Sequence, residues 1–175
     1  MVFEHASTAL WTAESLCPNN YVIYLERRWL YAVNHFLRND VFFSNSMLLE
    51  NSAVDLQHNT ENVSNFKFYT YDQILLFYIY YLFSLKVRLT VLVPYDNTKS
   101  AKIASLDKIY KSSSWLEREV GEMFKISYLG KNDNRRLLLD YSKSENPLLK
   151  NYSVHGLENL SYNFFEDQVS YCGRR

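Results

Sequence analysis

The sequence LLFYIYYLFSLKVRLTVLVP, residues 75–94, contains two apolar runs with a short break between them. In the second run, Val87, Leu89, Val91 and Val93 alternate with residues such as Arg88 and Thr90, which is the period of a strand. The first run is rich in Tyr, Phe and Ile, which favours a buried strand. A membrane-spanning helix needs about 20 apolar residues, and this run is too short. The stretch therefore predicts two strands joined by a tight turn, and no membrane span.

Apolar spacing also predicts the elements that precede this hairpin. We expect a short helix over residues 9–16, a strand over Tyr21–Leu25, a helix over about Arg27–Leu37 and a strand over Met47–Val54. A polar, Asn-rich segment at about 56–72 is expected to form a surface insertion, in which Phe66–Tyr71 extends into a strand. Residues 1–111 are thus expected to form one α/β domain.

A second helix is expected over residues 112–125. Ser114 followed by Glu117 has the spacing of a capping box, and Leu116, Val120, Met123 and Phe124 recur at helical intervals. The remaining positions carry Glu117, Arg118, Glu119 and Glu122. Such a face is either solvated, with Arg118 and Glu122 as an i,i+4 pair, or docked on a partner. The residues alone do not decide between these two interpretations.

Residues 126–175 lose the periodicity but keep scattered aromatic residues. Disordered segments are usually poor in aromatic residues, and this segment has no apolar run sufficient for a core of its own. We therefore expect an extended C-terminal arm that wraps a partner protein. The fold class is α+β: a small, mostly antiparallel sheet with flanking helices and this arm.

The composition excludes several classes of site. The chain has 175 residues, a formal net charge of zero, 15 Tyr and 11 Phe but only 4 Gly, so no glycine-rich nucleotide-binding loop is present. The two cysteines lie far apart and the four histidines lack metal-ligand spacing. Arg135 and Arg136 are able to hold carboxylates or phosphate, and Glu119 and Glu122 are a weak candidate carboxylate pair. We therefore expect a non-catalytic interaction module.

A family resemblance lies in the second helix and after it. Trp115-Leu-Glu-Arg-Glu-Val120 with Met123-Phe124 resembles the signature of the 30 kDa subunit (subunit 9 type) of respiratory complex I, NADH:ubiquinone oxidoreductase. Arg135–Tyr141 matches a further block of that family, and Asn146–Asn151 matches another weakly. Upstream, Leu48–Asp55 resembles the family's strand ending in Val-Asp, and Ser105-Leu106 the Ser-Ile before the signature helix. Among the departures, Gly121-Glu122 replaces Tyr-Asp and Lys125 replaces a glycine.

The resemblance implies a scaffold subunit in the peripheral arm of complex I, beside the large quinone-site (49 kDa-type) subunit. It implies no catalytic group and no cofactor on this chain, since FMN and the iron–sulfur clusters belong to other subunits. Together with an N-terminus that lacks a targeting pattern and a composition typical of AT-rich coding, it suggests a mitochondrially encoded protein on the matrix side of the inner membrane. The residues it assigns to interfaces are Trp115, Glu117, Arg118, Glu119, Phe124, Arg135, Arg136, Asp140, Tyr141, Pro147 and Leu148.

Two other classes of function remain open from the residues. One is a module that binds single-stranded nucleic acid through aromatic residues on a sheet, although the zero net charge and the alternation of Phe77–Tyr81 onto both faces speak against it. The other is a small hydrolase that uses the glutamate cluster of the second helix.

Overall fold

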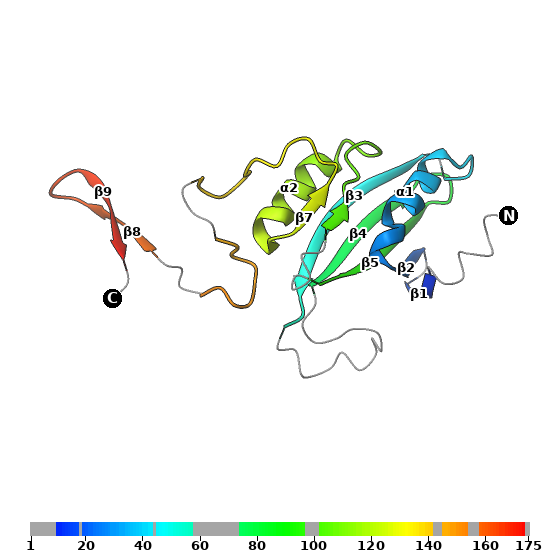
Figure 1. Cartoon of the computed structure of the whole chain (residues 1–175), viewed down its shortest axis with the longest axis horizontal. Helices are drawn as coiled ribbons and strands as arrows, with labels where there is room; N and C mark the ends of the chain where they lie inside the picture. The colour runs from blue at the N-terminus through cyan, green and yellow to red at the C-terminus, as the bar shows by residue number, and fades with distance from the viewer. Residues whose placement is uncertain are drawn as a thin grey trace.

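The computed structural model describes residues 10–17, 19–43, 45–57, 74–96, 102–141, 145–153 and 158–173. Within these residues, a five-stranded sheet has the order β1-β2-β5-β4-β3 (Figure 1). Its strands are β1 (Leu10–Cys17), β2 (Asn20–Leu25), β3 (Ser46–Asp55), β4 (Ile74–Leu82) and β5 (Val87–Tyr95). Only β2 and β5 pair in parallel, so the sheet is mostly antiparallel, as the sequence predicts.

The predicted hairpin forms the centre of the sheet. β4 and β5 pair in register from Ile74↔Tyr95 to Leu82↔Val87, and Lys86 adopts a positive φ of 54° in the turn. Side chains alternate between buried and half-buried along β4. Tyr78 and Tyr80 are completely buried, and burial raises their pKa well above the ordinary tyrosine value.

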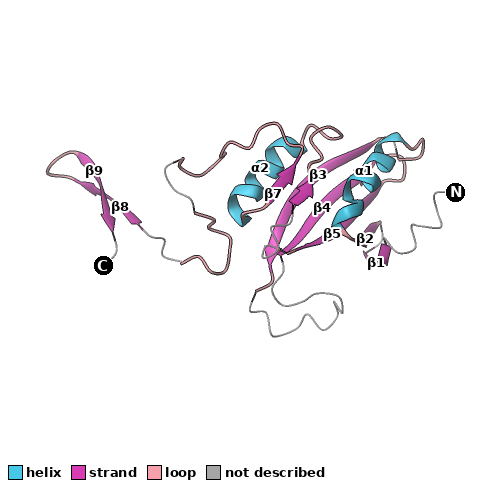
Figure 2. Ribbon diagram, in the orientation of Figure 1, coloured by secondary structure: helices cyan, strands magenta, loops and turns pink. Residues whose placement is uncertain are grey.

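Two helices pack against the sheet (Figures 1 and 2). Helix α1 (Leu30–Asn39) follows a short 3₁₀ turn, η2 (Arg27–Trp29), and buries Leu30 and Leu37 in the main apolar core. Helix α2 (Ser113–Phe124) buries Val120 and Phe124 in the same core. The Tyr110 ring, in the segment before α2, packs 5.7 Å from the Tyr80 ring. Both helices therefore cover the face of the sheet that carries Tyr78 and Tyr80.

Two predictions about local structure are wrong. The sequence predicts a helix over residues 9–16, but Leu10–Cys17 forms β1 and pairs antiparallel with β2, because a partner strand outweighs a weak local preference. Ser114 does not cap α2, since the helix begins at Ser113 and its first turn has no side-chain cap. Of the expected insertion and its strand, residues 58–72 lie outside the described part of the chain.

The sequence does not predict the short strands that follow β5. Strand β6 (Lys102–Ala104) pairs in parallel with β7 (Ser127–Leu129), which returns the start of the C-terminal arm to the domain. Further along, β8 (Glu158–Asn163) and β9 (Gln168–Gly173) form an antiparallel hairpin. Figure 1 shows this hairpin at the end of the molecule remote from the five-stranded sheet.

The end of α2 yields a testable stability prediction. Lys125 follows the helix in the left-handed conformation, with φ 59° and ψ 39°, at the position where the family pattern has glycine. A residue with a Cβ is disfavoured there, so we expect Lys125→Gly to raise the free energy of unfolding by about 0.5–1 kcal/mol. Urea unfolding measures the change. Gly130→Ala, at φ 77°, is the reverse control and is expected to destabilise; equal stability of all three proteins would contradict the prediction.

Candidate interaction surface

A buried ion pair connects α2 to the segments on either side of it. The Glu117 carboxylate accepts hydrogen bonds from the Ser105 hydroxyl at 2.6 Å and from the Leu106 N–H at 2.7 Å. It also contacts the Lys131 ammonium at 3.2 Å, and both side chains are almost fully shielded from solvent. Lys131 donates a further hydrogen bond, of 2.8 Å, to the Ser114 carbonyl. Glu117 therefore joins the helix, the loop before it and the arm after it.

A second carboxylate of α2 holds the arm further along. Glu122 accepts hydrogen bonds from three consecutive backbone N–H groups, those of Leu137 at 2.9 Å, Leu138 at 3.0 Å and Leu139 at 2.6 Å. Successive N–H groups of this kind form a concavity that favours an anion. Burial by itself raises the pKa of Glu122, but the three N–H groups and Arg136 outweigh it and hold the pKa below its ordinary value.

Arg118 holds the backbone between these two anchors. Its guanidinium donates to the carbonyls of Arg135 at 2.9 Å and Arg136 at 3.0 Å, and lies 3.6 Å from the Asp133 carboxylate. It also sits 5.4 Å over the Trp115 ring, a cation–π arrangement. Arg135 forms a bidentate pair with Asp133, which lowers the pKa of that carboxyl. The charged face of α2 is thus largely occupied by this chain's own arm.

The next part of the arm crosses the end of α2 toward the sheet. Asn146 donates to the Glu122 carbonyl at 2.6 Å, and the Leu148 N–H donates to the Met123 carbonyl at 3.3 Å. The Lys150 N–H then donates to the carboxylate of Asp55, the last residue of β3, at 3.0 Å. These contacts fix the route of the arm over described residues 145–150.

The predicted interface residues fall into two groups. Glu117 and Phe124 are buried and Arg118 is half-buried, so they offer little or no surface for direct contact with a partner. In contrast, Trp115 is 63% exposed and Tyr141 73% exposed. The others are exposed or half-buried along the arm and the outer side of α2: Glu119, Arg135, Arg136, Asp140, Pro147 and Leu148.

The sequence left two interpretations of the charged face of α2, a solvated face or a face docked on a partner. Neither includes the contacts that this face makes with the chain's own arm. In the described residues Arg118 pairs with Asp133, whereas Glu122 is held by backbone N–H groups, so the predicted Arg118–Glu122 pair does not form. Glu119 is exposed while Glu122 is buried, so they form no carboxylate pair either. The sequence reasoning missed the anchoring role of Lys131, for which the chain offers no local signal.

The β8–β9 hairpin has one apolar face and one polar face. Tyr162 lies opposite Val169, and opposed residues share a face of a sheet; Leu160, two residues before Tyr162, lies on the same face. The other face carries Ser161 and Ser170, whose hydroxyls share a 2.9 Å hydrogen bond.

The apolar side of this hairpin is open to solvent. Leu160 is 65%, Tyr162 57% and Val169 61% exposed, and Phe164 and Phe165 at the turn are 87% and 100% exposed. A two-stranded hairpin is at best marginally stable in water, and large exposed apolar patches mark interaction sites.

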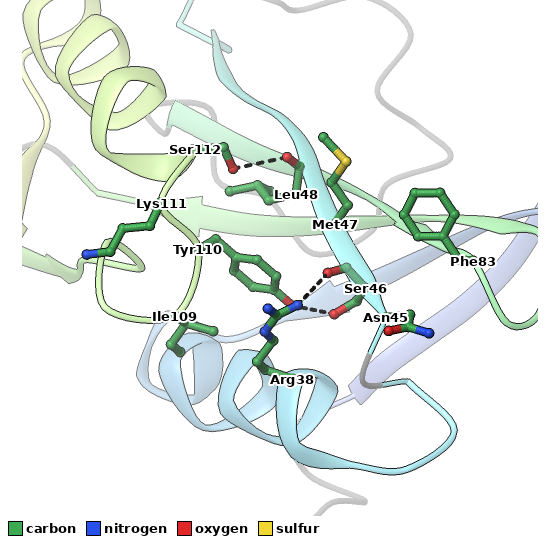
Figure 3. Close-up of a pocket in the computed structure, with 10 residues that line it drawn as sticks. All are labelled: Arg38, Asn45, Ser46, Met47, Leu48, Phe83, Ile109, Tyr110, Lys111 and Ser112. Carbon is green, nitrogen blue, oxygen red and sulfur yellow. Dashed lines mark hydrogen bonds between the residues drawn. The ribbon is translucent and has the colours of Figure 1, made fainter.

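A depression lies beside the start of β3, and several of its polar groups bond to one another. It encloses about 620 Å³ between the end of α1, β3 and the segment before α2. Figure 3 shows that its polar groups bond to each other: Arg38 donates to the Ser46 carbonyl, and the Ser46 hydroxyl meets Tyr110. Ser112 donates to the Leu48 carbonyl, so these side chains protect the edge of β3.

The described residues contain no group of three or more His, Cys, Asp or Glu placed to hold a metal ion. In the same part of the chain, neither helix has the length and apolar character required to cross a membrane.

Comparisons with known proteins agree with these features. A family model described as "Respiratory-chain NADH dehydrogenase, 30 Kd subunit" matches residues 23–158. NADH-ubiquinone oxidoreductase subunit 9 of Paramecium primaurelia is 35% identical over 170 residues, which cover 97% of this chain and 79% of that protein. A subunit of the NADH-quinone oxidoreductase of Rickettsia bellii is 32% identical over 93 residues, covering 53% and 47% respectively.

Two solved structures share the fold. The trypsin-resistant fragment (1-134) of Nqo5 superposes with a TM-score of 0.55 at 19% identity, over 75% of this chain and 96% of the fragment. A chain of the membrane-bound sulfane sulfur reductase, an archaeal respiratory membrane complex, superposes with a TM-score of 0.64 at 16% identity, over 87% of this chain and 84% of that one.

Proposed function

Because the chain belongs to the family of the 30 kDa subunit of respiratory-chain NADH dehydrogenase, we propose that it is a non-catalytic scaffold subunit of the peripheral arm of respiratory complex I. In this role it holds neighbouring subunits in register, so that electron transfer from NADH to ubiquinone proceeds through cofactors on those subunits. The chain itself binds no cofactor in this proposal.

The observation that carries the proposal is the apolar surface on a firmly anchored arm. Glu117 holds the Lys131 ammonium, and Arg118 and Glu122 hold the backbone from Arg135 to Leu139, yet the same arm exposes Leu138, Tyr141 and Leu148. An isolated domain gains nothing from presenting such side chains to water. Fixed in place, they form a preorganised contact surface, which lowers the entropy cost of binding another subunit.

The partner that best fits this role is the large quinone-site (49 kDa-type) subunit, with other peripheral-arm subunits beside it. The proposed location is the matrix side of the mitochondrial inner membrane. Assembly with partners on that side of the membrane requires no membrane-spanning helix in this chain.

The nucleic-acid alternative receives no support. A stacking platform requires exposed rings on one face of a sheet. On β4, Tyr78 and Tyr80 are completely buried under the helices, and Phe77 and Tyr81 on the other face are half-buried. The relatives from Paramecium and Rickettsia are both named as oxidoreductase subunits, and neither name refers to nucleic acid.

Native gel electrophoresis of respiratory membranes, stained for NADH oxidation, tests the proposed function. Mass spectrometry is expected to find this chain in the band that oxidises NADH. If the chain instead migrates as a small free species and is missing from that band, the proposed function is wrong.

The β8–β9 hairpin provides a matched pair of variants within this proposal. We expect Leu160→Asp to reduce incorporation into the complex about tenfold, because it places a charge on the apolar face. Ser161→Asp alters the neighbouring residue on the polar face and is expected to leave incorporation within about twofold. The measurement is the amount of tagged chain in the native complex after import into isolated mitochondria, with the same mitochondrial presequence added to every variant. Equal incorporation of both variants would show that this face contacts no partner.

A further inference from the structure

A cleft between α2 and the arm carries an excess of positive charge. Its volume is about 560 Å³, and its charged lining residues are Lys102, Arg118, Lys125, Arg135, Arg136, Glu117 and Glu122. Five cations and two carboxylates give a local charge of about +3, and the sum is unchanged when the ion-pair partners Asp133 and Lys131 are added, whereas the whole chain has a net charge of zero. The excess is therefore specific to this place and is not a property of the composition.

The two carboxylates of the cleft bond to other groups of this chain. Glu117 is 1% exposed and bonds to Ser105, Leu106 and Lys131. Glu122 is 8% exposed and is held by three backbone N–H groups of the arm. Both carboxylates are buried, whereas Lys102, Lys125 and Arg135 are exposed, so solvent meets mainly positive charge in the cleft.

Two lysines that line the cleft, Lys102 and Lys125, form no ion pair with the described residues. Lys102 pairs in register with Ser127, which is two residues after Lys125. Both lysines are exposed, and neither takes part in a side-chain hydrogen bond or ion pair with the described residues. Two cations that line one cleft both attract an anionic ligand placed in it.

The arginines of the cleft are held in place before any ligand arrives. Arg118 donates to the Arg135 and Arg136 carbonyls, and Arg136 donates to the Asp140 carbonyl at 3.0 Å. Arg135 is paired with Asp133 but its side chain is 73% exposed. Guanidinium groups fixed in this way lose little conformational entropy on binding a carboxylate.

We propose that this cleft binds an acidic segment of a neighbouring subunit, with carboxylates that meet Lys102 and Lys125. The inference rests on the proposed function, because it takes the partner from the same complex. Carboxylates are favoured over the phosphates of a nucleic acid because the cleft lacks an exposed ring for a base. Tyr128, its one lining aromatic residue, is half-buried with the Lys131 ammonium 5.6 Å over its ring.

Carbodiimide cross-linking of the intact complex tests the proposal directly. This reagent activates a carboxyl group, which then forms an amide with a lysine amine in direct contact. Mass spectrometry is expected to find Lys102 or Lys125 joined to Asp or Glu of one neighbouring subunit. Cross-links from these lysines only to this chain's own carboxylates, or none while other lysines react, would overturn the proposal.

Charge reversal in the full chain gives an independent test. We expect Lys102→Glu with Lys125→Glu to reduce incorporation into the complex about tenfold. The control pair, Lys108→Glu with Lys111→Glu, changes two exposed lysines outside the cleft and is expected to change incorporation by less than about twofold. Reversing the cross-linked acidic residues of the partner to lysine is expected to restore incorporation of the first pair. Without this rescue, the cleft does not bind that segment.

The outcomes separate this proposal from the proposed function. If the double variant incorporates normally into the NADH-oxidising complex, the cleft proposal fails and the scaffold role stands. If the unmodified chain is absent from that complex, the scaffold role fails and the cleft proposal falls with it. Salt-sensitive binding of a fluorescent oligothymidylate by the full chain, abolished in the double variant while incorporation is unchanged, would assign the cleft to nucleic acid and overturn the proposal.

Discussion

Replacing Lys131 with methionine is expected to lower the free energy of unfolding by about 3–5 kcal/mol. The Lys131 ammonium lies 3.2 Å from the Glu117 carboxylate, and the two side chains are 1% and 0% exposed. Removal of the ammonium leaves an uncompensated carboxylate in the interior, where water cannot solvate it. Urea unfolding of the isolated chain, followed by circular dichroism, measures the loss.

The double variant Glu117→Gln with Lys131→Met distinguishes a stranded charge from lost packing. Glutamine keeps the shape of the side chain but carries no charge, so the double variant is expected to recover more than about half of the lost stability. Glu119→Gln changes an exposed carboxylate on the same helix and is expected to alter stability by less than about 0.5 kcal/mol. If the double variant is as unstable as Lys131→Met alone, the buried charge is not the cause.

The elements that the sequence predicted correctly are those with a strong local pattern. The β4–β5 hairpin follows from alternating apolar residues, and α2 from apolar residues at helical spacing. Residues 10–17 form a strand because they pair with β2, and short apolar runs do not distinguish helix from strand. The three-residue strands β6 and β7 are too short to have a period and exist only through each other.

The sequence did not reveal how the charged residues of α2 are used within the fold. Ser114 and Glu117 have the spacing of a capping box, yet Glu117 turns inward to Ser105 and Lys131, which are 12 and 14 residues away. The local sequence does not distinguish a glutamate that caps its own helix from one that bonds to residues far along the chain. The binding of Glu122 to the arm is equally hidden, because its partners are backbone N–H groups, which every residue except proline has.

Glu122→Gln is expected to lower the free energy of unfolding at neutral pH by about 1.5–3 kcal/mol. The neutral amide is a weaker acceptor for the N–H groups of Leu137, Leu138 and Leu139, and its NH₂ group faces N–H donors instead of accepting from them. The arm is thereby loosened, so limited trypsin digestion is expected to cut faster after Arg136. Urea unfolding at pH 7 and peptide mapping of the digest measure the two effects.

The pH dependence of this difference identifies the carboxylate as its cause. The pKa of Glu122 is lowered in the folded chain from its ordinary value of 4.5. Because the pKa is lower in the folded chain, the Glu122 anion stabilises the fold at pH values above the ordinary pKa. This stabilisation is lost as the pH falls through the pKa of the folded chain. The unmodified chain is therefore expected to approach the stability of Glu122→Gln as the pH falls below about 4.5, although other carboxyl groups also titrate there and lower both curves. A stability difference that stays constant from pH 7 to pH 2 would show that the amide disturbs packing, and that the charge of Glu122 does not hold the arm.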